Sequence, residues 1–122
     1  MIGYVTLGTQ DLDRAAAFYD ALLGELGATR SLEGENYIAW ATESGGPMLS
    51  LMLPFDKQPA SVGNGTMVAL AAESPAQVDA LYRKAMGLGA DDEGAPGERG
   101  PGFYAAYFRD PDGNKLAIYL TE

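Results

Sequence analysis

The sequence predicts an α+β fold built from two tandem βαβββ modules. Two capped amphipathic helices lie at a fixed offset, because Asp11 and Ser74 are 63 positions apart, as are Gly24 and Gly87. Each predicted helix follows a short strand-like run and precedes further strand-like runs, a pattern that indicates duplication of one supersecondary unit. We therefore expect a single domain over residues 1–122, with a first module at 1–55, a linker at 56–65 and a second module at 66–122.

The first module opens with a short run of β-branched and aromatic residues at 2–7, which predicts a strand. Asp11 can cap the helix that follows by accepting from the free N–H groups of its first turn. Apolar side chains then recur at helical spacing at Ala15, Phe18, Tyr19, Leu22 and Leu26. Gly24 and Gly27 are the candidate helix ends. Three strand-like runs follow, at 29–33, 36–41 and 48–53, and predict an antiparallel meander.

The second module repeats this plan. Residues 66–71 resemble a strand, and Ser74 followed by Pro75 predicts the start of a helix. Its apolar stripe comprises Val78, Leu81, Tyr82 and Ala85. We expect the acidic, Gly- and Pro-rich residues 91–102 to form mainly a loop, with one short edge strand at most. Strand-like runs at 103–108 and 115–120 then flank Asp110-Pro-Asp-Gly-Asn114, which predicts a hairpin turn.

Composition excludes several classes of function. The 122 residues include no cysteine and no histidine, so disulfide scaffolds and thiol catalysts are excluded, and a general base would have to be a shifted carboxylate, Lys or Tyr. With 17 acidic and 8 basic side chains, the net charge of -9 opposes binding to nucleic acid or to anionic lipid. The chain shows neither a signal-peptide pattern nor a long apolar run, which predicts a cytoplasmic protein with no membrane partner.

Four segments together carry a family resemblance. They are the strand at 4–7 before the Asp-capped helix, Arg14-Ala-Ala-Ala-Phe-Tyr19 with Leu22-Leu-Gly24, the run at 65–69, and residues 107–115 with Asp-Pro-Asp-Gly-Asn. At this spacing the chain resembles the vicinal oxygen chelate superfamily, which includes glyoxalase I, bleomycin-resistance proteins, fosfomycin-resistance enzymes and extradiol dioxygenases. The resemblance covers nearly the whole chain, and it implies that the curved sheets of the two modules enclose a glyoxalase-like cup.

Enzymes of that superfamily hold a divalent metal in the cup with His and Glu. The resemblance places three ligand positions on Tyr4, Met67 and Ala117, and a fourth near Ser50. Divalent metals need several deprotonated donors that converge on one point, and the strand-like runs at 2–7, 48–53, 66–71, 103–108 and 116–120 contain no Asp, Glu, His or Cys. We therefore expect no metal, no other cofactor, no metal-assisted chemistry and no catalytic residue.

Strand alternation gives the expected lining of the cup. In the run 48–53, Leu49, Leu51 and Leu53 would pack under the helices, and the intervening residues would face the cup. The run 36–41 leaves two alternatives, with either Tyr37 or Trp40 inward. Tyr107 falls where the resemblance places a substrate-contacting tyrosine. The predicted binding residues are Tyr4, Thr6, Tyr37, Met48, Ser50, Met52, Met67, Ala69, Tyr107, Ala117 and Tyr119, a lining that suits a small apolar or aromatic ligand.

The first functional hypothesis is a metal-independent binding protein of the glyoxalase and bleomycin-resistance type. One alternative is an isomerase or lyase that uses Tyr4, Tyr107 or Tyr119 as a proton donor, and another is a structural dimerisation module whose cup is filled by methionines.

Charged residues near the last hairpin have two interpretations each. Arg109 and Lys115 are either solvated charges or a rim that captures a ligand carboxylate. The acidic residues 91–93, with Glu98, are either a soluble loop or an attraction for a cationic ligand.

Sheet edges that need covering predict a homodimer, as is common for related chains of this length. The sequence leaves open whether each cup forms within one chain or from modules of two chains.

Overall fold

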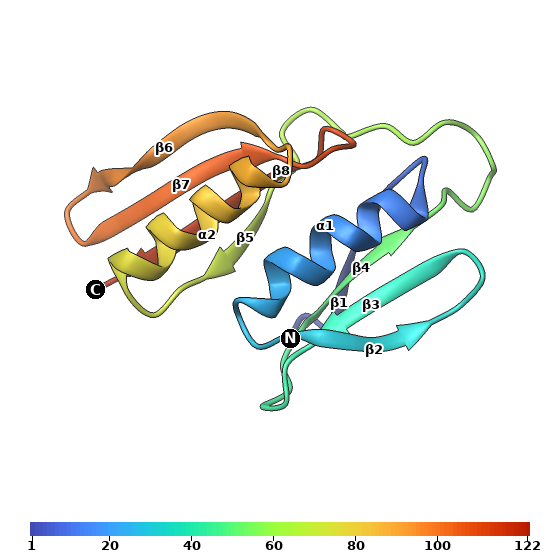
Figure 1. Cartoon of the computed structure of the whole chain (residues 1–122), viewed down its shortest axis with the longest axis horizontal. Coiled ribbons are helices and arrows are strands. Elements are labelled where there is room, and N and C mark those ends of the chain that lie inside the picture. The colour runs from blue at the N-terminus through green and yellow to red at the C-terminus, as the bar shows by residue number, and fades with distance from the viewer. The chain divides into compact units, whose positions relative to one another are not determined.

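The computed structural model describes residues 1–122 and divides the chain into two units, Met1–Val62 and Gly63–Glu122. Each unit contains one four-stranded mixed sheet and one helix (Figure 1). The elements follow the order β1-α1-β2-β3-β4 and then β5-α2-β6-β7-β8, so the predicted α+β fold of two βαβββ modules is confirmed. No helix is both long enough and apolar enough to span a membrane.

Unit 1 comprises β1 (Tyr4–Gly8), α1 (Leu12–Gly24), β2 (Thr29–Glu33), β3 (Tyr37–Ala41) and β4 (Met48–Met52). Its sheet has the order β1-β4-β3-β2, in which β1 runs parallel to β4 and the other pairs are antiparallel. Asp11 caps α1 as predicted, because its carboxylate accepts from the Arg14 backbone N–H at 3.1 Å. The chain leaves the helix through Gly27, whose φ of 78° lies in the left-handed region that glycine tolerates.

Unit 2 comprises β5 (Val68–Ala71), α2 (Pro75–Gly87), β6 (Asp91–Gly100), β7 (Phe103–Arg109) and β8 (Lys115–Thr121). The sheet order β5-β8-β7-β6 repeats that of unit 1, again with the first strand parallel to the last. Ser74 caps α2 by accepting from the Gln77 backbone N–H at 3.1 Å. The two helices have the same length of 13 residues, which agrees with the offset of the caps.

Strand β6 differs from the expectation for residues 91–102. A ten-residue strand, rather than mainly a loop, pairs with β7 along its length. Register shifts occur between Asp92 and Gly94, between Gly94 and Gly97, and between Glu98 and Gly100, so the residues of β6 do not alternate regularly between faces. The strand lies at the edge of the sheet, where charged side chains and proline are tolerated. Hydrogen bonding to β7 therefore holds residues 91–100 in an extended conformation. The local sequence has no period-2 pattern that would predict a strand there.

Each helix packs on one face of its own sheet and forms the core there. In unit 1 the buried side chains on this side are Leu7, Phe18, Tyr19, Leu22, Leu23, Ile38, Trp40, Leu49 and Leu51. In unit 2 they are Val78, Leu81, Ala85, Ala106, Phe108, Leu116 and Ile118. Burial of these apolar side chains is the main source of stability, at roughly 25 cal/mol for each Å² removed from water. The opposite surface of each sheet, here named its helix-free face, has no helix of its own unit upon it.

Candidate functional site

The helix-free face of unit 1 brings six of the predicted binding residues together. Parallel pairing of β1 with β4 places Tyr4 beside Met48 and Thr6 beside Ser50, and antiparallel pairing places Tyr37 beside Met52. The side chains on this face are uncharged. Tyr4 is 65% exposed, whereas Ser50 is buried in the sheet. The face therefore combines phenol rings and flexible thioethers, side chains that bind apolar surfaces of irregular shape.

The position of Trp40 shows which residues of β3 point to the helix side, a question that the sequence leaves open. Its indole ring lies 5.8 Å from the ring of Tyr19 on α1, so it points to the helix side. Because successive strand residues alternate, Tyr37 and Ala39 point to the helix-free face. The carboxylate of Asp20 on α1 accepts from the indole N–H at 2.9 Å. A buried indole that needs a polar partner is thereby satisfied on the helix side.

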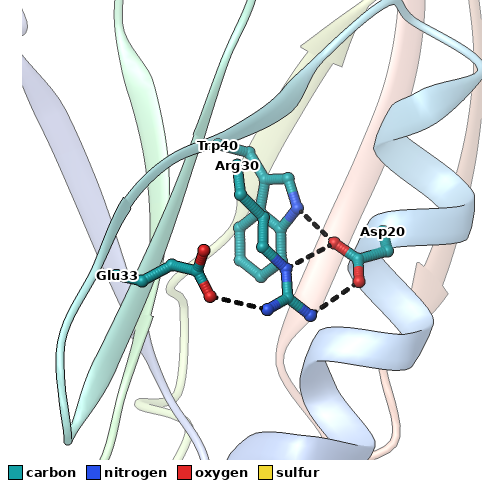
Figure 2. Close-up of polar contacts among 4 residues, drawn as sticks. All are labelled: Asp20, Arg30, Glu33 and Trp40. Carbon is teal, nitrogen blue, oxygen red and sulfur yellow. Dashed lines mark hydrogen bonds and ion pairs between the residues drawn. The ribbon is translucent and has the colours of Figure 1, made fainter.

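Asp20 joins α1 to the β2–β3 hairpin through a charged cluster, shown in Figure 2. Arg30 of β2 donates to both carboxylate oxygens of Asp20, at 3.0 and 2.7 Å, and to Glu33 at 2.8 Å. The hydrogen bonds from Arg30 hold the pKa of Asp20 below its ordinary value, although partial burial opposes this. The pKa of Arg30 is raised by the same carboxylates. This cluster lies on the helix side of unit 1, so we assign it a structural role.

The helix-free face of unit 2 brings together four further predicted residues. Tyr107 and Ala69 both pair with Ala117, one from each neighbouring strand, and Tyr119 pairs with Ala105. The rings of Tyr119 and Phe103 stack at 5.9 Å between centroids. Ala105 and Ala117, which pair with Tyr119 and Tyr107, are almost completely buried.

The intervening residues of β7 confirm this assignment of faces. The hydroxyl of Tyr104 donates to Asp79 of α2 at 2.7 Å, so Tyr104 points to the helix side. Met67 precedes β5 and is 44% exposed, and strand pairing does not place it on either face.

Two cations lie on the ring of Tyr107. The guanidinium carbon of Arg99 is 5.4 Å from the ring centroid, and the ammonium nitrogen of Lys115 is 5.6 Å from it. Both distances are within the range of cation–π attraction. Arg109, also on β7, donates to Glu93 at 2.8 Å and to the Gly113 carbonyl at 3.0 Å. The helix-free face of unit 2 is therefore cationic beside its aromatic surface.

Arg99 is the residue of this cluster that the sequence does not single out. It lies in β6, and a residue in an irregular Gly-rich segment cannot be assigned to a sheet face by alternation. The neighbouring glycines are the only local indication of where Arg99 lies. They have no side chains and so leave space for the long Arg99 side chain to lie along the strand.

The positions that the superfamily resemblance gives to metal ligands do not fit a divalent cation. Tyr4, Ser50, Met67 and Ala117 supply neutral hydroxyls, a thioether and a methyl group, and none of these is a histidine or a carboxylate. No group of three or more His, Cys, Asp or Glu side chains lies close enough together to hold a metal ion. We therefore derive no chemical step through a metal.

Two tyrosines have perturbed pKa values, and both contact acidic residues away from the helix-free face. The hydrogen bond from Tyr82 to Asp92, at 2.8 Å, raises the pKa of Tyr82. The hydrogen bond from Tyr104 to Asp79 raises the pKa of Tyr104 in the same way. A raised pKa keeps the phenol protonated at neutral pH and suits a structural hydrogen-bond donor rather than a base.

An open pocket of about 470 Å³ lies in unit 1, close to the end of β4. Met52 is the one predicted binding residue that lines it, and Leu53, expected under the helix, also lines this pocket. The others are Gln10, Asn36, Pro54, Phe55, Lys57 and Gln58. The sequence could not indicate this pocket, because the segment after β4 has no apolar periodicity. Phe55 is 95% exposed and Lys57 has a positive φ of 63°, so this segment is a turn that projects from the sheet.

The family is shown by comparison with known proteins. A model of the Glyoxalase/Bleomycin resistance protein/Dioxygenase superfamily matches residues 1–118. The chain belongs to this superfamily. This is the vicinal oxygen chelate superfamily that the sequence resembles, so the resemblance is confirmed.

Solved structures agree with this assignment to the superfamily. A glyoxalase/bleomycin resistance protein from Albidiferax ferrireducens T118 is 36% identical, with a TM-score of 0.89 over 98% of this chain and 97% of that one. A glyoxalase/bleomycin resistance protein/dioxygenase family enzyme from Burkholderia phytofirmans PsJN shares the fold at 20% identity, with a TM-score of 0.79 over 98% of both chains. A lactoylglutathione lyase from Agrobacterium tumefaciens shares it at 24% identity, with a TM-score of 0.72 over 98% of this chain and 92% of that one. No curated protein matches the sequence.

Proposed function

We propose that this superfamily member binds a small apolar or aromatic molecule on the helix-free faces of its sheets, without a metal ion. The supporting observation is the surface of unit 2, where Phe103, Tyr107 and Tyr119 surround the methyl groups of Ala105 and Ala117. The flat rings beside these small side chains present an aromatic surface that a planar or compact ligand can contact. Met48 and Met52 on unit 1 supply side chains that adapt to irregular shapes.

The metal-free part of the proposal follows from the donors available. A Lewis-acid mechanism needs a cation held by several anionic or imidazole ligands, and the helix-free face of unit 1 carries only neutral side chains. Calorimetric titration with nickel, zinc, manganese and iron should show only nonspecific binding. A stoichiometric site of micromolar affinity would contradict this part.

A ligand-binding test can use neutral benzene derivatives as probes. Benzamide added to isotopically labelled protein should shift the methyl resonances of Ala105, Ala117 and Met48, and should leave those of the helices unchanged. Ala117→Leu should weaken this binding because the larger side chain takes the place of the ligand beside Tyr107. The matched control Ala80→Leu, on the exposed side of α2, should leave the binding unchanged. Shifts confined to the helix side, or equal effects of both variants, would contradict the proposal.

We also propose that two copies of the chain associate in the cytoplasm. Within the sheets, β1 and β2 are the outer strands of unit 1, and β5 and β6 are those of unit 2. Outer strands present unpaired backbone groups that natural proteins cover. Sedimentation equilibrium should give a dimer at micromolar concentration, and a monomer would remove this proposal. Cell fractionation tests the location.

A further inference from the structure

We infer that the ligand is an anion, and that unit 2 receives the carboxylate of a small organic acid between Arg99 and Lys115, beside the ring of Tyr107. This inference rests on the proposed function, because it specifies the polar end of the molecule that the helix-free face binds. It concerns only residues of unit 2, all of them within β6, β7 and β8.

Arg99 and Lys115 have no carboxylate partner. Arg99 contacts the Ala95 carbonyl oxygen and the Tyr107 ring, and Lys115 contacts that same ring. By contrast, Arg109 is paired with Glu93 at 2.8 Å. The chain has 17 acidic side chains for 8 basic ones, so carboxylates are abundant, and yet none pairs with Arg99 or Lys115. Two cations beside one ring repel each other unless an anion lies near both.

Glycines of β6 leave the space that the Arg99 side chain occupies. A Cβ atom at Gly94 would lie 3.0 Å from Cδ2 of Tyr107 and 3.2 Å from Nη2 of Arg99. A Cβ atom at Gly97 would lie 3.5 Å from Nη1 of Arg99. The guanidinium therefore lies back along β6, across two residues without side chains, and reaches the ring. Its hydrogen bond to the Ala95 carbonyl holds it there and leaves further N–H donors of the guanidinium for a ligand.

The surface next to the two cations is uncharged. Tyr107 pairs with Ala117 and Ala105 pairs with Tyr119, so an apolar and aromatic surface adjoins the charged end of the face. An arginine presents several donors in a fork that matches a carboxylate, and a lysine adds a second positive charge. A cationic end beside an apolar surface matches a molecule with a carboxylate and an apolar or aromatic body.

The net charge of -9 does not oppose this inference at short range. At physiological ionic strength the Debye length is about 8 Å, so exposed carboxylates elsewhere on the surface are largely screened from the ligand. The cations that touch the ring act within that distance. Local charge therefore decides which ligand this face accepts, and the acidic total does not favour a cationic one.

The test compares three probes of the same shape on the full chain by calorimetry: benzoate, benzamide and benzylammonium. Benzoate should bind at least about tenfold more tightly than benzamide, a difference of about 1.4 kcal/mol, and benzylammonium should bind most weakly. Raising the salt concentration should weaken the binding of benzoate and leave that of benzamide unchanged.

Two double variants then locate the charge. Arg99→Gln with Lys115→Gln should reduce benzoate affinity about tenfold and leave benzamide affinity unchanged. The matched control, Arg83→Gln with Lys84→Gln on the exposed surface of α2, removes the same charge and should leave both affinities unchanged. Arg99→Lys should keep most of the preference for benzoate. Thermal unfolding of each variant checks that the fold is retained.

The outcomes separate the two proposals. If benzamide binds as tightly as benzoate, or if the Arg99 and Lys115 variant keeps the full preference, the anion inference is wrong and the proposed binding of a small molecule stands. If the control pair on α2 lowers benzoate affinity equally, only general charge is involved, and the anion inference is again wrong. If none of the probes binds at millimolar concentration, both proposals are contradicted.

Discussion

The two units share one scaffold and differ in the chemistry of their helix-free faces. Both sheets have the first strand parallel to the last, both helices contain 13 residues, and both helices begin at a side-chain cap. On the helix-free face, however, unit 1 carries Tyr4, Met48 and Met52 and no charge, whereas unit 2 carries Tyr107 with two cations. The helix side, which is alike in the two units, maintains the fold. The helix-free face, where the units differ, is where function is expected.

The units also differ in the polar contacts that join each helix to its sheet and in those that close the last hairpin turn. Unit 1 joins α1 to its sheet through the Asp20 cluster, and unit 2 joins α2 to its sheet through the hydrogen bond of Tyr104 to Asp79. The β3–β4 connection of unit 1 is exposed, whereas the β7–β8 turn of unit 2 is closed around Asp110, which is 2% exposed. These contrasts rank the expected effects of substitutions.

The largest expected effect is that of Asp110→Ala in the unit 2 turn. The Asp110 carboxylate accepts from the backbone N–H groups of Asp112 and Asn114, both at 2.9 Å, and from the Asn114 side chain at 3.0 Å. Loss of an acceptor that serves buried donors should lower the free energy of unfolding by about 3 kcal/mol. The matched control is Thr42→Ala in the unit 1 connection, where exposed hydrogen bonds should be worth no more than about 0.5 kcal/mol. Urea unfolding measures both, and equal effects would remove the contrast between the two turns.

The second expected effect is that of Asp20→Ala on unit 1. The substitution leaves the Trp40 N–H without its acceptor and Arg30 without its bidentate partner, which should cost about 2 kcal/mol. Asp20→Asn keeps an oxygen acceptor and should cost less. Glu35→Gln, on an exposed residue, should change the stability little.

The pH dependence of the Asp20 effect has a definite sign. Arg30 lowers the pKa of Asp20 below its ordinary value of 3.8, so the contribution of Asp20 to stability is present above that value and is lost as the pH falls through the lowered pKa. The difference in stability between wild type and Asp20→Asn should therefore be constant near neutral pH and should shrink in acid. A difference that grows in acid would show that Arg30 does not stabilise the carboxylate.

Local rules explain why the helices and the family could be predicted from the sequence. Asp11 and Ser74 are caps whose partners lie three residues along the chain, so their role depends on neighbouring sequence alone. The strand parity of β3 could not be predicted, because the run Tyr37–Ala41 is apolar on both faces. Trp40 points to the helix side, where it packs on Tyr19 and its indole N–H donates to Asp20, and both partners lie about 20 positions away in the sequence.

The candidate site could be predicted in its apolar part and in Lys115, but not in Arg99. Residues such as Tyr107, Ala117 and Tyr119 follow regular alternation in β7 and β8, so their common face can be read from the sequence. Arg99 lies in β6, where three register shifts break the alternation. Its place beside Tyr107 depends on pairing between strands and on the space left by glycines, and neither is a local property of the sequence.

The third expected effect is that of Tyr104→Phe on unit 2, which should lower the free energy of unfolding less than Asp20→Ala does. The substitution removes the hydrogen bond to Asp79 and keeps the ring. Asp79 raises the pKa of Tyr104 above 10.0, so this contribution is fully present below that pH and is lost as the pH rises through the raised value. Thermal unfolding at neutral and at strongly alkaline pH should show the difference from wild type shrinking in alkali. The control Tyr107→Phe, whose ring contacts do not use the hydroxyl, should change stability less.

The sharpest test of the difference between the faces comes from two glycines. Gly94→Ala should displace Tyr107 and Arg99, because its Cβ would lie 3.0 and 3.2 Å from them, and Gly34→Ala should displace Tyr37, whose Cε1 would lie 2.2 Å from the new Cβ. Gly34→Ala should cost about 1 kcal/mol because only the Tyr37 side chain must move. Gly94→Ala should cost more, since the φ of 159° at Gly94 is a backbone conformation that residues with a side chain rarely adopt.

The two glycine variants should differ in ligand preference, which calorimetry with benzoate and benzamide measures. Gly94→Ala should lower the ratio of benzoate to benzamide affinity several-fold, because the anion needs Arg99 in place, whereas Gly34→Ala should leave that ratio unchanged, since no charged side chain lies on its face. Equal changes in the ratio would mean that ligand charge is not selected by unit 2. A change confined to Gly94→Ala would mean that the charge of the ligand is recognised in unit 2.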